Sequence, residues 1–240
     1  MKFCNKDISK ASKNVSKYAQ AEIVQSGDGS HTIFLPNLNE TYHSTYGAIE
    51  ESKHIFIDAG LKTIINSHEE INIFELGFGT GLNAFLTYFE GKNTKINYIT
   101  VESNPLKESF YSKLNYHKII DKDNSKEIFL KLHTSDWNRK VAFNENFTIK
   151  KINDKVQNIK LENNNFDLVY FDAFSPDLQP ELWTEQVFRK IASAMKINGI
   201  LLTYSAKGSV KRALKNAGFK VEGLPGPTGK REITRARRMV

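Results

Sequence analysis

The most informative segment of the chain is a glycine-rich turn that follows an apolar run. Residues 73–76, which include Glu75, lead into Gly77, Gly79 and Gly81 at alternate positions, and Asn83 lies at the start of a helical pattern. Glycines spaced in this way let the backbone turn sharply and approach a ligand closely, where any Cβ atom would collide. The spacing therefore predicts a cradle for a nucleotide-type ligand. A plain tight turn between a strand and a helix is the simpler alternative.

The glycine pattern also indicates which ligand to expect. A dinucleotide-binding fingerprint reads Gly-x-Gly-x-x-Gly, whereas here Gly81 comes one residue early and an acid, Glu75, ends the strand. The Glu-x-Gly-x-Gly-x-Gly form resembles motif I of the Rossmann-like methyltransferases, in which this backbone lies under the methionine part of S-adenosylmethionine. The resemblance implies S-adenosylmethionine as cofactor, bound by Glu75, Gly77, Gly79, Gly81 and Asn83.

Two further acids follow neighbouring predicted strands. An adenosine needs its ribose hydroxyls held, and an acid at the end of the second strand, about 20 residues further on, can accept both hydrogen bonds. Glu102 directly follows residues 96–101, so we predict that it binds the ribose, although a solvated acid at a strand end is the alternative. Asn153 and Asp154 follow the next strand and resemble the pair that contacts the adenine amino group in this superfamily. Asp154 is therefore assigned to the cofactor site by resemblance.

A buried strand at residues 166–171 places Asp172 at its carboxyl end, where ligands bind in doubly wound sheets. The run Phe-Asp-Ala-Phe-Ser-Pro at 171–176, with Pro-Glu-Leu-Trp at 180–183, resembles the methyltransferase half of the MnmC family, including its stand-alone MnmD-type members. Segments 42–44, 51–54, 204–208 and 226–232 look like that family too, so the resemblance extends from about Glu22 to the C-terminus. Bifunctional members carry an FAD-dependent oxidase domain after this half, and this chain ends instead. We therefore expect it only to methylate.

The resemblance implies a substrate and a product. The substrate would be 5-aminomethyl-(2-thio)uridine at the wobble position of certain tRNAs, supplied by separate enzymes, and the product 5-methylaminomethyl-(2-thio)uridine. An alkyl ammonium has a pKa near 10, so the amine must lose a proton before it can attack a methyl group. Asp172 is the predicted catalytic residue, which would bind and orient this amine and relay its proton, acting more by positioning than by base strength. A helix N-cap or a cofactor contact is the alternative role.

Substrate-binding residues are predicted from aromatic and basic side chains near these motifs. A tRNA base must leave its stack to enter the pocket, and Tyr46, Phe174 or Trp183 could hold it, although each could equally belong to the core. We predict that Lys230 or Arg231 orders the pocket mouth with Glu232. The remaining arginines near the C-terminus, Arg235, Arg237 and Arg238, would contact tRNA phosphates or stay in water. The formal net charge of +7 favours a polyanionic partner, but the Lys-, Asn- and Ile-rich composition weakens this argument.

The elements that must position these residues follow from the hydrophobic pattern. From residue 71 onward, short apolar runs alternate with helical segments, which is typical of βαβ units and a mostly parallel sheet. The expected fold class is α/β, a Rossmann-like methyltransferase with a seven-stranded sheet whose last two strands form an antiparallel hairpin. The predicted strands are 71–76, 96–101, 148–152, 166–171, 200–204, 219–222 and 232–235, and the predicted helices are 82–89, 107–114, 125–131, 181–196 and 207–217.

The first part of the chain reads as an addition to that fold. Residues 1–20 are polar and predict a flexible leader, and residues 21–66 predict a small β-hairpin, 22–25 with 31–35, followed by a helix within 42–60. The methyltransferase domain would occupy 67–240. No apolar stretch approaches the ~20 residues that a membrane span needs, and no secretory signal is evident, so we expect a cytoplasmic protein without a membrane partner. Cys4 is the only cysteine, and we expect no metal.

Two other functions remain open at this stage. A spermidine-synthase-like aminopropyltransferase shares the fold, the glycine loop, the strand-end Glu and a catalytic Asp, but it needs an acidic pocket for a polyamine, whereas this chain is basic. A non-catalytic RNA-binding module would have no need for intact Gly77, Gly79, Gly81 and Glu102. Binding of S-adenosylmethionine, followed by methyl transfer to tRNA, would separate the three possibilities.

Overall fold

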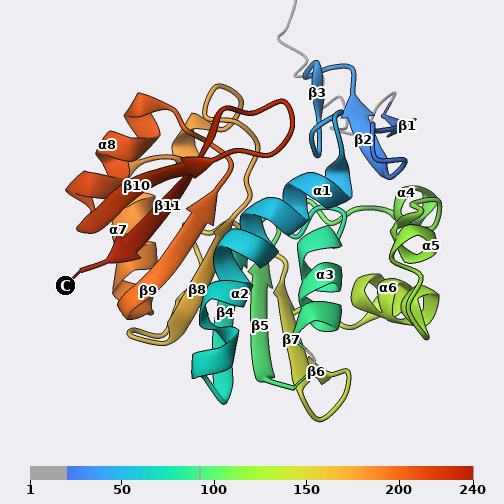
Figure 1. Cartoon of the computed structure of the whole chain (residues 1–240), viewed down its shortest axis with the longest axis horizontal. Coiled ribbons are helices and arrows are strands. Elements are labelled where there is room, and N and C mark those ends of the chain that lie inside the picture. Colours follow the sequence, from blue (N-terminus) through green and yellow to red (C-terminus); the bar gives the residue numbers. More distant parts are fainter. Residues whose placement is uncertain (1–20, 92, 240) are drawn as a thin grey trace, which may run out of the picture.

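A computed structural model describes residues 21–91 and 93–239, so the predicted leader at 1–20 lies outside the described residues. The largest element is an eight-stranded sheet with the order β10-β11-β9-β8-β4-β5-β7-β6 (Figure 1). Its strands are β4 (Glu70–Leu76), β5 (Lys95–Val101), β6 (Lys140–Ala142), β7 (Phe147–Ile152), β8 (Phe166–Phe171), β9 (Met195–Thr203), β10 (Phe219–Pro225) and β11 (Glu232–Arg238).

The strand pairing confirms the predicted fold class. β4 pairs in parallel with β5 and β8, β5 with β7, and β8 with β9, while β10, β11 and β9 are antiparallel. The predicted number of seven strands was wrong for this sheet, because β6 adds an eighth at its edge by pairing antiparallel with β7. With three residues, β6 is too short to show a period of two in the sequence.

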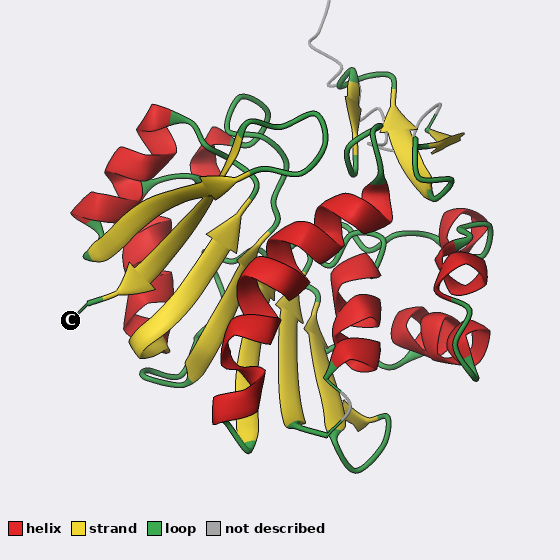
Figure 2. Cartoon of the chain, viewed as in Figure 1, coloured by secondary structure: helices red, strands yellow, loops and turns green. Residues whose placement is uncertain are grey.

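Helices cover both faces of the sheet (Figure 2). They are α3 (Leu82–Glu90), α4 (Glu108–Tyr111), α5 (Tyr116–Ile120), α6 (Ser125–Thr134), α7 (Glu185–Ala194) and α8 (Gly208–Asn216). Because successive side chains of a strand point to opposite faces, β8 contributes Leu168 and Tyr170 to one hydrophobic core, and Val169 and Phe171 to the other. Such burial on both faces explains why this strand is apolar throughout. None of the helices in the described part has the length and apolar character to cross a membrane.

Two predicted helices differ from the observed ones. The helix predicted at 181–196 is a 3-10 turn, η3 (Pro180–Leu182), followed by α7, whose first turn is capped by the Thr184 hydroxyl accepting from the Val187 N–H. Met195 already begins β9, since its backbone is extended. The helix predicted at 107–114 is only the short α4, and α5 follows it after a turn.

The N-terminal extension is a small sheet and a helix. Strands β1 (Glu22–Gln25), β2 (His31–Leu35) and β3 (Glu40–Thr41) form an antiparallel sheet with one strand more than the predicted hairpin. The helical stretch comprises α1 (Ala48–Ser52), the π-helical η1 (Lys53–Leu61), α2 (Lys62–Ile64) and the 3-10 turn η2 (Ile65–Ser67). It packs so closely on the main sheet that a Cβ atom on Gly60 would lie 2.4 Å from Leu202 Cδ1.

The turn between β1 and β2 caps the start of α1. Gly47, at the N-cap position, has no side chain to accept hydrogen bonds from the first helical N–H groups. Asp28 takes this role from the turn: its Oδ2 accepts from the Glu50 N–H at 3.0 Å, and its Oδ1 from the Ser30 N–H at 2.9 Å. The Ser26 hydroxyl accepts from the Ala48 N–H at 3.1 Å. The glycine-rich turn therefore holds the extension's sheet and helix together.

This capping can be tested by replacing Asp28 with Ala. Loss of an N-cap carboxylate typically costs about 0.5–2 kcal/mol, so we expect Asp28→Ala to lower the free energy of unfolding by about 1–2 kcal/mol in urea denaturation. Glu22→Ala, which removes an exposed acid from the neighbouring strand, is the matched control and should leave stability within about 0.5 kcal/mol. Equal effects of the two substitutions would contradict the capping role.

Candidate active site

A cavity of about 610 Å³ opens at the carboxyl ends of the parallel strands. Its walls come from the glycine loop, from the loops after β5, β7 and β8, from residues 40–46 of the extension, and from Gly229 and Lys230 between β10 and β11. Figure 2 shows these loops gathered at the edge of the sheet that carries the extension. The volume suits a nucleoside-sized ligand together with part of a second reactant. Within the residues described, no group of three or more His, Cys, Asp or Glu residues is arranged to hold a metal ion.

The glycine loop adopts the backbone that its sequence predicts. Gly77, Gly79 and Gly81 have φ values of 97°, 50° and 73°, in the region that favours glycine. Gly77 and Gly79 line the cavity, and a Cβ atom on Gly77 would lie 2.5 Å from the Asp172 carbonyl oxygen. Gly81 is not part of the cavity wall. It precedes α3 and packs under Phe78 and His133, so its role is in the shape of the loop.

Two acids lie at the cofactor end of the cavity. Glu102 Oε2 accepts from the Gly79 N–H at 3.1 Å and Oε1 from the Asn104 N–H at 2.8 Å, which fixes the carboxylate beside the glycine loop. Asp154 also lines the cavity, and hydrogen bonds from Asn158 and the Lys155 N–H lower its pKa, so it is ionised at neutral pH. Hydroxyl and amino groups of a nucleoside can donate hydrogen bonds to two such carboxylates beside a glycine loop, so the residues present fit S-adenosylmethionine.

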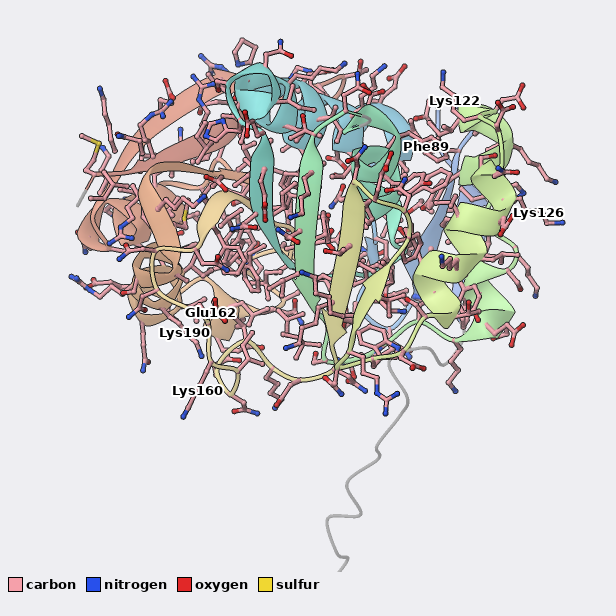
Figure 3. All side chains as sticks on the ribbon, turned by 90° about the horizontal axis from the view of Figure 1, so that it is seen from below. Phe89, Lys122, Lys126, Lys160, Glu162 and Lys190 are labelled. Carbon is pink, nitrogen blue, oxygen red and sulfur yellow. The ribbon has the colours of Figure 1, made fainter. Side chains whose placement is uncertain are left out.

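The loop that carries Asp154 is supported from below by a lysine. Lys190 extends from α7 and donates to the Val156 and Gln157 carbonyl oxygens at 2.7 and 2.9 Å. Figure 3 shows Lys190 beside the part of this loop that carries Lys160 and Glu162. The contact holds Val156 and Gln157 in the cavity wall next to Asp154.

Asp172 also lines the cavity, and Asn83 positions it. Asn83 Nδ2, on the first turn of α3, donates to Asp172 Oδ2 at 2.8 Å. Burial raises the pKa of Asp172 to about 7, with the hydrogen bond from Asn83 opposing it, the charge of Glu51 raising it further and that of Lys230 lowering it. Asp172 therefore titrates near neutral pH. Asn83, which was predicted to bind the cofactor, lines the cavity and also orients this carboxyl group.

Glu75 lies beneath this pair and does not line the cavity. It is fully buried, and neither carboxyl oxygen has a hydrogen-bond partner within the described part of the chain; the same is true of Asn83 Oδ1. Burial raises the pKa of Glu75 to about 8 despite its neighbours Thr100 and Asn83, and the charge of Asp172 raises it further. Glu75 is therefore protonated at neutral pH, and it lies beside Asn83 and Thr100. The predicted direct contact with the cofactor stays a prediction.

The aromatic candidates separate into cavity wall and core. Phe174 lines the cavity and packs edge-on against Tyr42, with ring centroids 5.0 Å apart. Tyr46 also lines it and is 59% exposed, with Gly229 against its ring. Trp183 is buried against Phe171 and does not line the cavity, although its Nε1 donates to the Phe174 carbonyl at 2.8 Å. Trp183 therefore holds the Phe174 backbone.

The basic residues are arranged differently from the prediction. Lys230 lines the cavity but forms its ion pair with Glu51, while Glu232 pairs with Lys211 at 2.7 Å. Arg231 is exposed and is not among the residues that line the cavity. The three terminal arginines have partners within the chain: Arg235 bonds Glu222, Arg237 the Asn198 carbonyl, and Arg238 the Asn164 side chain.

Sequence reasoning missed two histidines that support the glycine loop. His43, in the cavity wall, has its Nε2 3.3 Å from Thr80 Oγ1, and burial lowers its pKa to about 4. His133 lies in α6 with its Nε2 3.0 Å from the Thr80 carbonyl, and burial lowers its pKa to about 3. Both are neutral at physiological pH. An isolated histidine gives no sequence signal for this role.

The raised pKa of Glu75 predicts a specific dependence of stability on pH. In the folded protein Glu75 keeps its proton up to about pH 8, whereas in the unfolded chain it releases this proton near pH 4.3. The stability contributed by the protonated Glu75 is therefore full below the unfolded pKa and is lost as the pH rises toward 8. Glu75→Gln is neutral throughout. From pH 5 to 7.5, urea unfolding should show this variant gaining about 2–3 kcal/mol relative to the wild type. For the exposed control Glu22→Gln, the curve of unfolding free energy against pH should run parallel to that of the wild type. A parallel curve for Glu75→Gln as well would contradict a neutral, buried Glu75.

Comparison with known proteins agrees with this geometry. Residues 115–239 match the sequence profile of a family described as S-adenosyl-L-methionine-dependent methyltransferase. The chain is 28% identical over 90% of its length to the tRNA 5-methylaminomethyl-2-thiouridine biosynthesis bifunctional protein MnmC of Cupriavidus metallidurans, and 29% identical over 85% to that of Campylobacter hominis, covering 34% and 31% of those proteins. It thus spans about a third of their length.

A solved structure shows the same architecture. The crystal structure of MNMC2 from Aquifex aeolicus superposes with a TM-score of 0.75 at 29% identity, covering 90% of this chain and 69% of that one. The family profile, the fold and the cofactor cradle agree with one another. The chain belongs to the family of S-adenosyl-L-methionine-dependent methyltransferases.

Proposed function

We propose that this methyltransferase acts on the amine of 5-aminomethyl-(2-thio)uridine at the tRNA wobble position and forms 5-methylaminomethyl-(2-thio)uridine. The observation that carries the proposal is the placement of Asp172, a carboxyl group with a pKa of about 7, in the same cavity as the cofactor cradle. The names of the relatives, which refer to biosynthesis of this nucleoside in tRNA, support the substrate. We further propose that the protein works in the cytoplasm and that separate enzymes supply the aminomethyl precursor.

At the cofactor end, we propose that the Gly77 and Gly79 backbone lies along the methionine part, that Glu102 accepts from the ribose hydroxyls and that Asp154 contacts the adenine. Bound there, S-adenosylmethionine supplies a methyl group on a positively charged sulfur; the amine nitrogen bonds to the methyl carbon while the C–S bond breaks and leaves its electron pair on sulfur. The chain's task is to align the amine with that methyl group and to leave it with a free lone pair.

At the acceptor end, Asp172 would remove the proton that blocks the lone pair. The substrate arrives as an ammonium, and transfer of one proton gives a neutral amine and a neutral carboxylic acid. A pKa of about 7 is closer to that of an alkyl ammonium than the ordinary value near 4, so the transfer is less uphill than to an exposed Asp. Asn83 holds Oδ2, which leaves Oδ1 for the amine. Base strength therefore adds to positioning.

For the nucleoside itself, we propose that Tyr46 and Phe174 hold the flipped base. Tyr46 is exposed at the mouth, and Phe174 directly follows Asp172 and Ala173 in the cavity wall. Stacking on aromatic faces is a common way to bind an unstacked RNA base. An aminopropyltransferase would bind a polyamine through acidic side chains, and the cavity wall does carry acids beside Lys230, so its charge does not separate the two reactions. The family profile, which describes a methyltransferase, favours methyl transfer.

The proposed function is tested with bulk tRNA from a strain that lacks this enzyme. Purified protein and S-adenosylmethionine should convert the aminomethyl nucleoside of this tRNA into the methylaminomethyl form, detected by mass spectrometry of the digested RNA. Persistence of the aminomethyl nucleoside, although the protein binds the cofactor in calorimetry, would reject this substrate.

Glu102→Ala should weaken binding of S-adenosylmethionine by about 1–3 kcal/mol, because it removes charge-assisted hydrogen bonds to the ribose. Calorimetry measures the affinity, and the unfolding transition shows whether the fold is retained. Glu181→Ala is the matched control, since Glu181 is an exposed acid that also lines the cavity. An unchanged affinity in a folded Glu102→Ala variant would mean that the ribose is held elsewhere.

Asp172→Asn should reduce methyl transfer by about 10²–10⁴-fold while changing the cofactor affinity little, because the proposed partner of Asp172 is the amine. In the wild type, the rate should rise with pH through about 7 as the carboxylate forms. In the variant this inflection should be absent, and part of the rate should return at high pH, where more amine is neutral. Equal losses of cofactor affinity and turnover would place Asp172 on the cofactor side.

A further inference from the structure

The loop between β10 and β11 brings a lysine to the acceptor end of the cavity. Backbone hydrogen bonds from the Gly226 N–H to the Arg231 carbonyl, and from the Lys230 N–H to the Pro227 carbonyl, give this loop a fixed shape. Figure 1 shows it reaching from the C-terminal hairpin toward the extension. Gly229 packs so closely on the Tyr46 ring that a Cβ atom would lie 2.3 Å from it. The loop therefore depends on contact with the extension.

Lys230 is anchored by an ion pair with Glu51 of α1. Glu51 is only 8% exposed, and its other carboxyl oxygen accepts from the Ser44 N–H at 2.7 Å, so the carboxylate is fixed. Lys230 Nζ also lies 4.3 Å from the centre of the Tyr204 ring. The Tyr204 hydroxyl donates at 2.8 Å to the carbonyl of Ala173, the residue after Asp172. The ammonium group is thus held in the wall that carries the proposed base.

We propose that the Lys230 ammonium, anchored on Glu51, is a positioning residue that favours loss of the proton from an acceptor amine bound at Asp172. The inference rests on the proposed function, because it concerns a primary amine. The Lys230 ammonium repels a second ammonium and so favours the neutral amine, the form with a lone pair. The same cation lowers the pKa of Asp172, which makes that group a weaker base but keeps it ionised near neutral pH and so able to accept the proton. The proton moves from the amine nitrogen to the Asp172 carboxylate, and Lys230 keeps its own proton.

The charges around Asp172 show why such a cation is needed. Glu51 and Asp172 line one cavity, and alone they would stabilise the ammonium form of the acceptor, which cannot be methylated. Lys230 neutralises Glu51. The other titratable groups near the acceptor end are Glu75 from β4, Tyr98 from β5, Tyr170 from β8, Tyr204 after β9, Glu40 from β3, His43 after β3, and Asp177, which pairs with Lys207. Among the charges acting on Asp172, Glu51 raises its pKa and Lys230 lowers it.

The kinetic test is the pH dependence of kcat for aminomethyl tRNA at saturating S-adenosylmethionine. For Lys230→Met, the rising limb should move up by about one pH unit, with roughly a fivefold lower rate near pH 7 that recovers at high pH. Lys230→Arg keeps the charge and should keep the wild-type profile. Arg231→Met removes the neighbouring exposed cation, which does not line the cavity, and should also keep it. A limb that stays in place in Lys230→Met would overturn the inference.

A second measurement needs neither cofactor nor substrate. The Asp172 carboxyl titration, followed by ¹³C NMR in the protein alone, should move to higher pH in Lys230→Met and to lower pH in Glu51→Gln, and should not move in Arg231→Met. General loosening of the fold cannot produce shifts of opposite sign. Equal or absent shifts would overturn the inference. If the wild-type enzyme methylates aminomethyl tRNA but the rising limb of the pH profile does not move in Lys230→Met, only the role of Lys230 is rejected. If the wild-type enzyme transfers no methyl group to this tRNA, the proposed function is rejected as well.

Discussion

The hydrogen bond from Asn83 to Asp172 is the interaction on which the geometry of the site depends. It joins the first turn of α3 to the end of β8 across the glycine loop. The two chain segments approach closely because Gly77 has no Cβ atom, which would otherwise collide with the Asp172 carbonyl. The loop proposed to bind the cofactor and the carboxyl group proposed to bind the amine are therefore held together by the fold. In such an arrangement, the distance between the two reactants is set by the fold and not by flexible side chains.

Burial then divides the acids of the cavity into two kinds. Glu102 and Asp154 accept backbone N–H hydrogen bonds, which suits carboxylates that bind hydroxyl and amino groups as acceptors. Asp172 has a raised pKa, because desolvation outweighs its hydrogen bond from Asn83. One cavity thus holds carboxyl groups that accept hydrogen bonds and an acid that can exchange its proton near neutral pH. The proposed transfer of a methyl group to an amine would use both.

The site residues that could be predicted from the sequence are those whose place in the fold follows from the strand that directly precedes them in the chain. A residue that follows a parallel strand lies at the carboxyl edge of the sheet wherever the strand pairs, so Glu102 and Asp172 could be placed in the cavity beforehand. No local pattern reveals the ion pair of Glu51 and Lys230, because these residues come from an α-helix and a hairpin loop far apart in the chain. The direction of Arg237 and Arg238 depends likewise on backbone carbonyl and amide groups that only the folded chain brings near.

The extension is part of the site, although the sequence suggested an addition in front of a separate domain. Its residues 40–46 form one wall of the cavity, and its helix α1 carries Glu51. The first turn of α1 is in turn fixed by Asp28, whose carboxylate accepts from the Glu50 N–H in a turn that does not touch the cavity. Glu51, which pairs with Lys230, therefore lies on a helix whose first turn is capped by Asp28. Since Gly229 and Lys230 both contact the extension, a shift of α1 would move the anchor of the hairpin loop and the aromatic wall together, and the charge balance at Asp172 would change with them.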